Sequence, residues 1–178
     1  VDATGKATQL SSGPVLEFSP FVAAGKPYFV RRDPNKNQGP LLRIESDGST
    51  TTLVSPVLYV WSTTSTSAYV AQNSRANSYD LWHVPLMGGA AQKISDANAG
   101  FRRLPGGVLF FLSSDNAGLF RPGQPPQLLG EPYSPVLVVS GGRIAALRSA
   151  DGALQLGTLD APGGGLGSPL QTGVTTLD

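Results

Sequence analysis

Residues 79–95 read Tyr-Asp-Leu-Trp-His-Val-Pro-Leu-Met-Gly-Gly-Ala-Ala-Gln-Lys-Ile-Ser, and this stretch decides the fold. Trp82 before the central glycines and Ile94 after them are residue types that favour β-strands. Gly88 and Gly89 between the two segments can adopt the positive φ values that a tight hairpin demands. The stretch therefore predicts two short strands joined by a Gly-Gly turn.

The same hairpin recurs along the chain. A glycine between two short apolar segments stands at five positions, separated by 35 to 43 residues: Gly5, Gly48, Gly88, Gly123 and Gly163. Two more strand-like runs precede each of the last four hairpins, at residues 15–18 and 28–31, 57–61 and 68–71, 100–104 and 108–112, and 136–139 and 143–147. A period of about 40 residues with four short strands is typical of a β-propeller blade. The sequence predicts an all-β fold of four-stranded antiparallel blades, with four complete repeats.

The repeats also predict the domain organisation. Units of about 14–55, 56–97, 98–131 and 132–172 follow residues 1–13, which look like the end of a preceding unit. A closed four-bladed ring would leave one strand over, because the fourth unit already holds its own last strand near Pro169. We therefore expect residues 1–178 to be one propeller domain and favour a portion of a larger propeller. Uncovered blades at both ends would favour self-association.

Composition narrows the class of protein. The formal charge of +1 argues against a nucleic-acid partner, and 40% hydrophobic residues suffice for a folded domain. We expect no membrane span and no signal peptide, since no apolar run reaches 18 residues and no basic segment opens the chain. The absence of cysteine and the low charged content of 14% suit a periplasmic, secreted or cell-surface protein.

Two elements resemble the repeats of TolB-like β-propellers. Phe18-Ser19-Pro20 followed by Gly25–Val30 is similar to the opening of that repeat, and Asp80-Leu81-Trp82 with Gly88-Gly89 is similar to its ending. The resemblance implies the propeller fold and no particular activity.

The turn between the first two strands of each unit departs from the family pattern. An Asp commonly anchors this turn in the family, whereas Ala23-Ala24, Thr63-Thr64-Ser65 and glycine pairs stand here. These turns must therefore depend on glycine conformations or on Ser and Thr hydroxyls.

The residues that carry chemistry are few, and we expect no enzyme activity, no cofactor and no metal. His83 is the only histidine, with no Ser or Asp partner identifiable in the sequence, and we interpret it as structural. A Gly-x-Ser-x-Gly motif is absent. Seven aspartates recur at expected turns, where the side chain fixes the turn: Asp33, Asp47, Asp80, Asp96, Asp115, Asp151 and Asp160.

Five residues are candidates for binding. Arg102 and Arg103 lie on an expected axis-lining strand and could offer fork-shaped donors to a carboxylate. Tyr59, Trp61 and Tyr133 lie near expected connections between blades, where propellers usually present their binding face. Solvated arginines and core aromatics are the competing interpretation.

These observations favour a non-catalytic propeller module that binds a protein or peptide outside the cytoplasm. Two alternatives stay open. One is an accessory propeller of a larger serine peptidase of the prolyl-oligopeptidase type, and the other is a carbohydrate-binding propeller.

Overall fold

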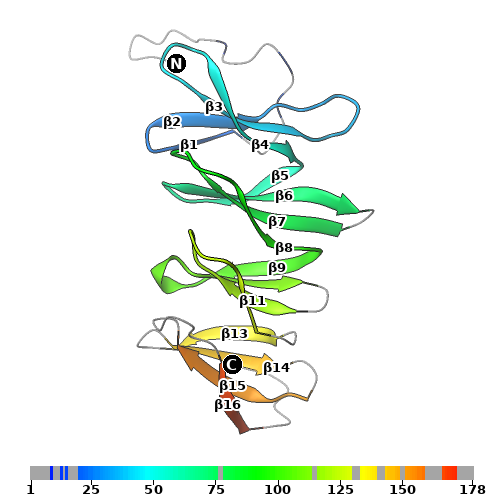
Figure 1. The fold of residues 1–178 in the computed structure, drawn as a ribbon, viewed down its shortest axis with the longest axis vertical. Coiled ribbons are helices and arrows are strands. Elements are labelled where there is room, and N and C mark those ends of the chain that lie inside the picture. Colours follow the sequence, from blue (N-terminus) through cyan, green and yellow to red (C-terminus); the bar gives the residue numbers. More distant parts are fainter. Residues whose placement is uncertain are drawn as a thin grey trace. The chain divides into compact units, whose positions relative to one another are not determined.

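The structure of the protein is a computed structural model. It describes residues 9, 13, 15, 20–75, 78–113, 116–129, 133–139, 143–148, 151–158 and 166–171. Of these it describes the backbone alone at 73–75, 99, 105, 133–139, 158 and 166–171. The described strands form four sheets of four strands, and in each sheet the strands are neighbours in chain order (Figure 1). The predicted class, all-β with four-stranded antiparallel blades, is confirmed.

Each sheet is one blade. Blade 1 holds β1 (Phe21–Ala23), β2 (Lys26–Val30), β3 (Gly39–Ile44) and β4 (Thr50–Val57), and blade 2 holds β5 (Tyr59–Thr63), β6 (Ser67–Arg75), β7 (Ser78–Pro85) and β8 (Gln92–Ser95). Blade 3 holds β9 (Asn98–Arg103), β10 (Leu109–Ser113), β11 (Ala117–Phe120) and β12 (Gln127–Leu128), with the short 3-10 helix η1 (Pro105–Gly107) between its first two strands. Blade 4 holds β13 (Tyr133–Val139), β14 (Arg143–Arg148), β15 (Leu154–Thr158) and β16 (Leu166–Gln171).

The hairpin glycines lie where the repeat predicts them. Gly48, Gly88 and Gly123 each connect the third strand of a blade to the fourth, with φ values of 82°, 121° and 80°. Gly89, next to Gly88, has a φ of 115°. Gly5 and Gly163 lie outside the described residues. The Gly-Gly turn is therefore confirmed, and its equivalents in blades 1 and 3 have the same place in the sheet.

The first strand of blade 1 is not where we predicted it. The sequence indicated residues 15–18, but β1 begins at Phe21 and pairs with β2 through a two-residue turn at Ala24 and Gly25. Val15 makes only an isolated bridge with Arg31, and residues 16–18 lie outside the described part of the chain. Similarly, Val57 ends β4, where it pairs with Gly39, and does not open blade 2.

The turns between first and second strands use the devices expected in place of aspartate. In blade 1, Ala24 and Gly25 both have positive φ values, of 47° and 73°. In blade 2, the Thr64 hydroxyl accepts hydrogen bonds from the backbone N–H groups of Thr66 and Ser67, at 3.2 and 2.9 Å. In blade 3, Gly106 and Gly107 within η1 have φ values of 70° and 75°. In these three blades a hydroxyl or residues at positive φ thus stand where TolB-like repeats commonly have an aspartate.

Glycine is required at position 39 because the backbone of Arg31 approaches it closely. A Cβ atom at this position would overlap the carbonyl oxygen of Arg31, at the start of the β2–β3 connection. The Arg31 N–H in turn donates to the carbonyl of Pro40, at 3.1 Å. Only glycine lets β2 and β3 close together here.

The chain divides into two compact units, residues 1–93 and 94–178. In the first unit, blades 1 and 2 share a core of buried apolar side chains: Ala23, Tyr28, Val30, Leu41, Val57, Ala68, Val70, Val84 and Leu86. In the second unit, blades 3 and 4 share a smaller core: Leu104, Val108, Phe110, Ala117, Leu119, Ile144 and Ala146. Each core lies between the facing surfaces of two sheets, as in sheet-on-sheet packing. That the chain forms one propeller domain, and part of a larger one, stays a prediction.

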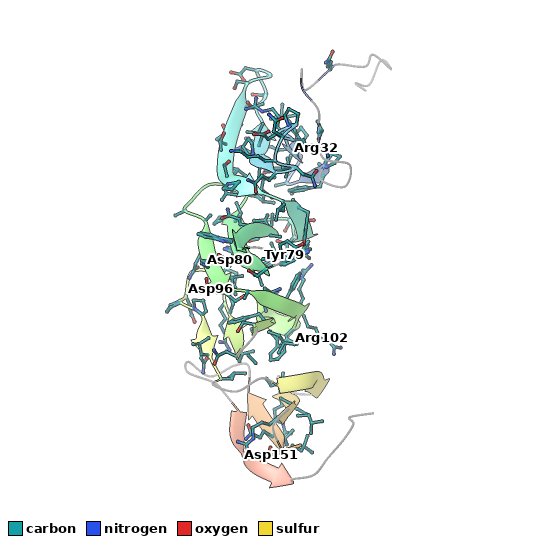
Figure 2. The ribbon with its side chains drawn as sticks, turned by 90° about the vertical axis from the view of Figure 1, so that its right-hand side faces the viewer. Arg32, Tyr79, Asp80, Asp96, Arg102 and Asp151 are labelled. Carbon is teal, nitrogen blue, oxygen red and sulfur yellow. The ribbon has the colours of Figure 1, made fainter. Side chains whose placement is uncertain are left out.

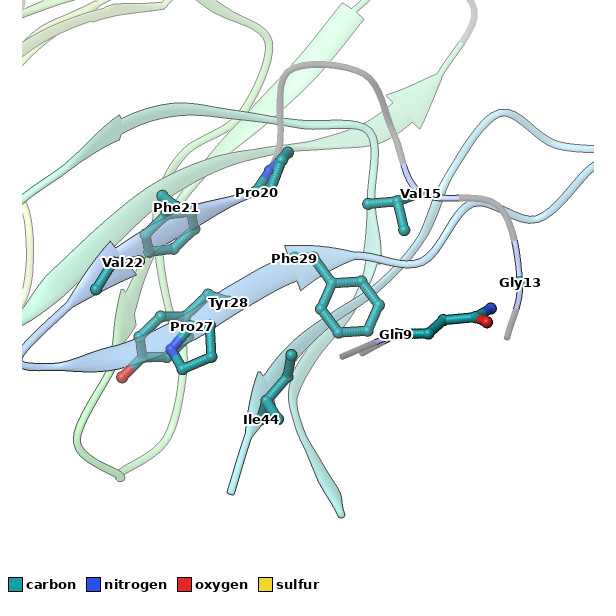
Figure 3. Close-up of a pocket in the computed structure, with 10 residues that line it drawn as sticks. All are labelled: Gln9, Gly13, Val15, Pro20, Phe21, Val22, Pro27, Tyr28, Phe29 and Ile44. Carbon is teal, nitrogen blue, oxygen red and sulfur yellow. The ribbon is translucent and has the colours of Figure 1, made fainter. Parts of the chain in front are cut away.

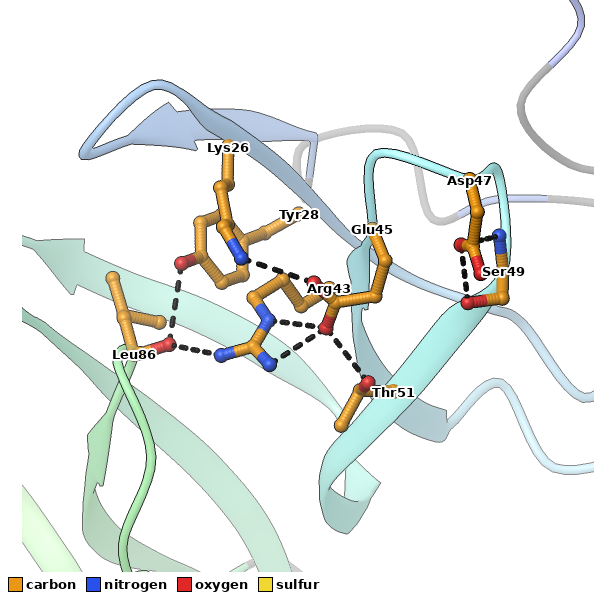
Figure 4. A network of polar contacts seen from close by, with 8 residues as sticks. All are labelled: Lys26, Tyr28, Arg43, Glu45, Asp47, Ser49, Thr51 and Leu86. Atoms are coloured by element: carbon orange, nitrogen blue, oxygen red, sulfur yellow. Dashed lines mark hydrogen bonds and ion pairs between the residues drawn. The ribbon is translucent and has the colours of Figure 1, made fainter.

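Polar contacts reinforce the first of these cores. The Tyr28 hydroxyl and Nη1 of Arg43, both on blade 1, donate to the carbonyl oxygen of Leu86 in the β7–β8 turn, at 3.2 and 3.1 Å (Figure 4). Leu86 is fully buried, so its carbonyl needs these partners. Blade 1 is therefore fixed to blade 2 by directional bonds as well as by apolar packing.

Glu45 organises the cations beside this contact. Its carboxylate accepts from Nζ of Lys26 at 3.0 Å, from Nε of Arg43 at 2.7 Å and from the Thr51 hydroxyl at 2.8 Å (Figure 4). Hydrogen bonds from Thr51, Lys26 and Arg43 lower the pKa of Glu45 to about 2. The carboxylate therefore stays ionised and holds Arg43 in position for Leu86.

Candidate binding site

Three aromatic side chains gather on one face of blade 2. Tyr59 and Trp61 lie two residues apart on β5, and Tyr79 lies near the start of β7. Because side chains alternate between the faces of a strand, Tyr59 shares a face with Ala71 and Leu81, which pair across the sheet. Tyr79 precedes Leu81 by two residues and lies on that face too. We call Tyr59, Trp61 and Tyr79 the aromatic cluster.

Two local features bring these rings together. The register between β5 and β6 shifts between Val60 and Ser62, and such a bulge turns the side chain that it contains, here Trp61. On the intervening strand β6, the residue opposite Tyr59 is Ala71, whose small side chain leaves room beside the Tyr59 ring. The rings can therefore meet above the middle strand.

The rings of the cluster meet at steep angles, from tilted to edge-to-face. The ring centroids of Tyr59 lie 5.3 Å from Trp61 and 5.5 Å from Tyr79, with interplanar angles of 57° and 64°. Trp61 and Tyr79 lie 6.3 Å apart at 89°. Edge-to-face contacts of this kind are favourable beyond the area they bury, so the cluster holds its own shape.

The cluster is partly open to solvent. Tyr79 is 36% exposed, and Tyr59 and Trp61 are half-buried. Burial, together with the neighbouring Tyr79 phenol, raises the pKa of the Tyr59 hydroxyl. Tyr59 is therefore protonated at neutral pH and offers a neutral hydroxyl beside apolar ring surface, a combination suited to contact with a protein.

An ion pair on the other face of blade 2 joins two of its strands. Asp80 follows Tyr79 on β7 (both labelled in Figure 2), so its side chain points to the opposite face. It is 7% exposed and pairs with Nζ of Lys93 at 2.6 Å. The interpretation of Asp80 as a turn residue is therefore wrong, because it lies within a strand. The Asp80–Lys93 pair ties β7 to the last strand of the blade.

Three of the other aspartates act in turns as predicted. Asp33, Asp47 and Asp151 each accept a hydrogen bond from the backbone N–H two residues later, at 2.8, 2.9 and 3.0 Å. Asp115 and Asp160 lie outside the described residues. These side chains fix local backbone geometry and are not part of the aromatic cluster.

His83 has a serine partner that the sequence did not identify. Its Nε2 shares a hydrogen bond of 2.8 Å with the Ser67 hydroxyl, which comes from the neighbouring strand β6. Both side chains are buried, at 4% and 7% exposure, and burial lowers the pKa of His83. A neutral, buried pair of this kind joins two strands, and a substrate could not reach Ser67 without local rearrangement.

The five predicted site residues are divided between the two compact units. Tyr59 and Trp61 are in direct ring contact in the first compact unit. Arg102 and Arg103 lie on β9 of the second unit, where both are exposed. Figure 2 labels Arg102. Tyr133 begins β13, but its side chain lies outside what the structure describes. A binding role for these five residues stays a prediction.

Tyr79 is the member that sequence reasoning missed. Its participation depends on the register of β5, β6 and β7, which places Tyr79 on the same face as Tyr59, two residues before Leu81. The only signal in the sequence was that Tyr79 is an aromatic residue at the start of the hairpin of residues 79–95. The distance from Tyr79 to Tyr59 and Trp61 depends on how three strands pair, which the sequence of one strand does not show.

The described parts of the chain hold neither a metal-ligand cluster nor a membrane-spanning helix. Among those residues there is no group of three or more His, Asp or Glu side chains that could hold a metal ion. The same residues contain no helix long and apolar enough to cross a membrane.

No protein-family model matches the chain, and no curated protein matches it. Among solved structures, the chain is similar to one described as "YCF48 bound to D1 peptide", with a TM-score of 0.42 and 15% sequence identity. The match covers 85% of this chain and 51% of that chain, so this chain spans about half the length of its structural neighbour. Membership of the TolB-like family stays a prediction.

Proposed function

We propose that this chain is a non-catalytic binding module that recognises a protein or peptide through the aromatic cluster of blade 2. The observation that carries the proposal is the meeting of Tyr59, Trp61 and Tyr79 on one face, within 6.3 Å of each other. Tyr and Trp are the residues most often found at the energetic centres of protein interfaces. They supply large contact areas with few rotatable bonds to immobilise.

The support beneath the cluster favours binding without rearrangement. Blade 2 is fixed to blade 1 by the shared core, and β7 is fixed to its neighbours by the Asp80–Lys93 and Ser67–His83 contacts. A partner that meets preformed rings loses less conformational entropy on binding. Extracytoplasmic location belongs to the same proposal, supported by the low charged content and the absence of cysteine.

A peptide array tests the proposal. The purified chain is applied to immobilised peptides of varied sequence and, in parallel, to immobilised glycans. Peptides bound by the wild type are measured again in solution with Tyr79→Ala and Trp61→Ala. Loss of an interface hot spot of about 2 kcal/mol corresponds to roughly 30-fold weaker binding, and we expect at least this for Trp61→Ala.

Met87→Ala is the matched control, because Met87 is a large apolar side chain on the same blade and is 57% exposed. Its binding should equal that of the wild type. The proposal fails if the wild type binds no peptide, or if both cluster variants bind peptides unchanged. Glycan binding that Trp61→Ala abolishes would instead support the carbohydrate-binding alternative.

A further inference from the structure

The connection between β2 and β3 carries an excess of positive charge. Residues 31–38 hold three cations, Arg31, Arg32 and Lys36, against one carboxylate, that of Asp33. All three cationic residues are exposed. None of their side chains forms an ion pair or a hydrogen bond with a residue that the structure describes. We call residues 31–38 the basic loop.

Other cations of the first compact unit are already neutralised. Lys26 and Arg43 share the carboxylate of Glu45, and Lys93 pairs with Asp80. These ion pairs lie within or between strands and have structural roles. The cations of the basic loop are instead available to a partner.

Hydrogen bonds close the basic loop on itself. The Asp33 N–H donates to the carbonyl of Gln38 at 2.8 Å, and the Asn37 N–H donates to the carbonyl of Asp33 at 3.1 Å. The Asp33 carboxylate accepts from the Asn35 N–H at 2.8 Å, so it is turned toward the loop backbone. A partner therefore meets cations on an ordered backbone, which lowers the entropic cost of binding.

The basic loop and the aromatic cluster lie at the same edge of neighbouring sheets. Gly39, which follows the loop, pairs with Val57 at the end of β4, and Tyr59 comes two residues after Val57. Tyr79 is at this edge too, because β5 and β7 both run antiparallel to β6. The β2–β3 connection and the start of β7 lie on the right-hand side of Figure 1, and Figure 2 looks onto that side.

A short peptide can span the two features. Paired residues on neighbouring strands are about 5 Å apart, and two residues of chain extend at most about 7 Å. Roughly four extended residues therefore reach from the base of the basic loop to Tyr59. Tyr59 is opposite Ala71, and Val70 beside Ala71 belongs to the core shared with blade 1. The cluster is thus on the face turned from blade 1, and a peptide reaches both features by crossing the edge.

The cavity beside the basic loop is uncharged. This cavity of about 550 Å³ adjoins the loop, because Val15 in its lining forms an isolated bridge with Arg31 (Figure 3). None of its ten lining residues is Asp, Glu, Lys, Arg or His. On the outer face of blade 1, turned away from blade 2, Phe29, Leu42 and Ile44 form a separate buried cluster. The positive charge at this part of blade 1 is therefore concentrated in the basic loop.

We infer that the segment recognised by the aromatic cluster is acidic, and that its Asp or Glu side chains contact the basic loop. The inference rests on the proposed function, because it names the class of peptide that the cluster binds. The guanidinium groups of Arg31 and Arg32 are fork-shaped donors that match carboxylates. Opposite charge also speeds encounter and disfavours basic partners. A nucleic acid would need cations spread over a face, whereas these three lie within six residues.

The test uses peptides of about eight residues with a central leucine or proline, each made with Glu, Gln or Lys at the same flanking positions. Their binding to the purified chain is measured in solution at low and at high salt. We expect the Glu version to bind about tenfold more tightly than the Gln version, and the Lys version to bind most weakly. Salt should reduce the preference, because it screens exposed charges.

Variants of the chain locate the effect. Arg32→Gln and Lys36→Gln should each weaken binding of the Glu peptides about threefold and leave the Gln peptides unchanged. Arg143→Gln is the matched control, since it removes the same charge from an exposed arginine on β14, outside the first compact unit. It should bind like the wild type. Circular dichroism confirms that each variant is folded.

The outcomes separate this inference from the proposed function. Equal binding of Glu and Gln peptides that Trp61→Ala still abolishes overturns the inference and leaves the proposed function intact. Binding that needs Arg32 but not Trp61 contradicts both, because the basic loop would then act without the cluster. An equal loss in Arg143→Gln would mean that only net charge matters, and it also overturns the inference. A single-stranded oligonucleotide that binds more tightly than the Glu peptides overturns it in favour of a nucleic acid.

Discussion

The two faces of blade 1 are built from alternate residues of the same strands, yet they are organised differently. The inner face joins blade 2 in a core of nine buried residues, with Tyr28 and Arg43 donating to one carbonyl of that blade. The outer face has a buried cluster of three residues beside a cavity of about 550 Å³. On the inner face, hydrogen bonds to the Leu86 carbonyl add direction to the apolar packing and so determine where blade 2 lies on blade 1.

Neighbouring leucines on β3 give the strongest test of this comparison. Leu41 faces the inner core and Leu42 the outer cluster, and both are almost fully buried, at 0% and 2% exposure. We expect Leu41→Ala to lower the free energy of unfolding by about 4 kcal/mol and Leu42→Ala by about 2 kcal/mol. The inner core is closely packed on both sides, whereas residues beside the cavity can relax around a deleted side chain.

Urea unfolding of the two variants measures both values. Equal losses, or a greater loss for Leu42→Ala, would contradict the distinction between the faces. The pair is its own control, because the substitution, the strand and the burial are matched.

The polar contact to Leu86 predicts a smaller, coupled effect. Tyr28→Phe removes one donor to the Leu86 carbonyl but keeps the ring, which stacks on Phe21 at 5.0 Å, so we expect a loss of about 1 kcal/mol. Arg43→Gln removes the other donor. In the double variant the carbonyl loses both donors, and we expect the loss to exceed the sum of the single losses by about 1 kcal/mol. Strict additivity in the double-mutant cycle would show that the two donors act independently.

The smallest expected effect concerns pH and Glu45. The pKa of Glu45 is lowered from an ordinary value of 4.5 to about 2 by hydrogen bonds from Thr51, Lys26 and Arg43. A carboxyl with a depressed pKa in the folded state contributes stability that is fully present above 4.5 and is lost as the pH falls toward 2. The wild type should therefore exceed Glu45→Gln in unfolding midpoint at neutral pH, and the difference should shrink over this interval.

Thermal unfolding of both proteins across the acidic range gives that difference directly. Subtracting the variant removes the contributions of Asp47 and Asp151, whose pKa values are also lowered. A difference that does not change with pH would mean that Glu45 acts through its shape and not through its charge.

Much of the fold could be predicted from local sequence. Glycines at a period of about 40 residues mark the turns between third and fourth strands, because positive φ values are available to glycine at little cost. The first strand of blade 1 was misplaced, since three residues at Phe21–Ala23 carry too little pattern to identify a strand. Pairing with Tyr28 and the turn at Ala24 determine that strand.

The candidate site was less accessible to sequence reasoning. Tyr59 and Trp61 were candidates because aromatic residues near blade connections suit binding, but Tyr79 joins them only through the register of three strands. His83 likewise gained its Ser67 partner from a strand 16 residues away in sequence. Neither contact leaves a local signal, because side-chain pairs across a sheet depend on which residues are opposite each other.

The sequence by itself determined the repeating unit of this protein: its all-β class, its four-stranded blades and the glycine turns that close them. Tertiary structure alone decided which face of each strand is covered, which rings meet on blade 2, and that Leu86 accepts from Tyr28 and Arg43. The physical reason is the separation along the chain over which each kind of interaction acts. Backbone φ preferences and residue alternation act within a few positions of the chain, whereas hydrogen bonding between sheets joins residues as distant as Tyr28 and Leu86, 58 positions apart.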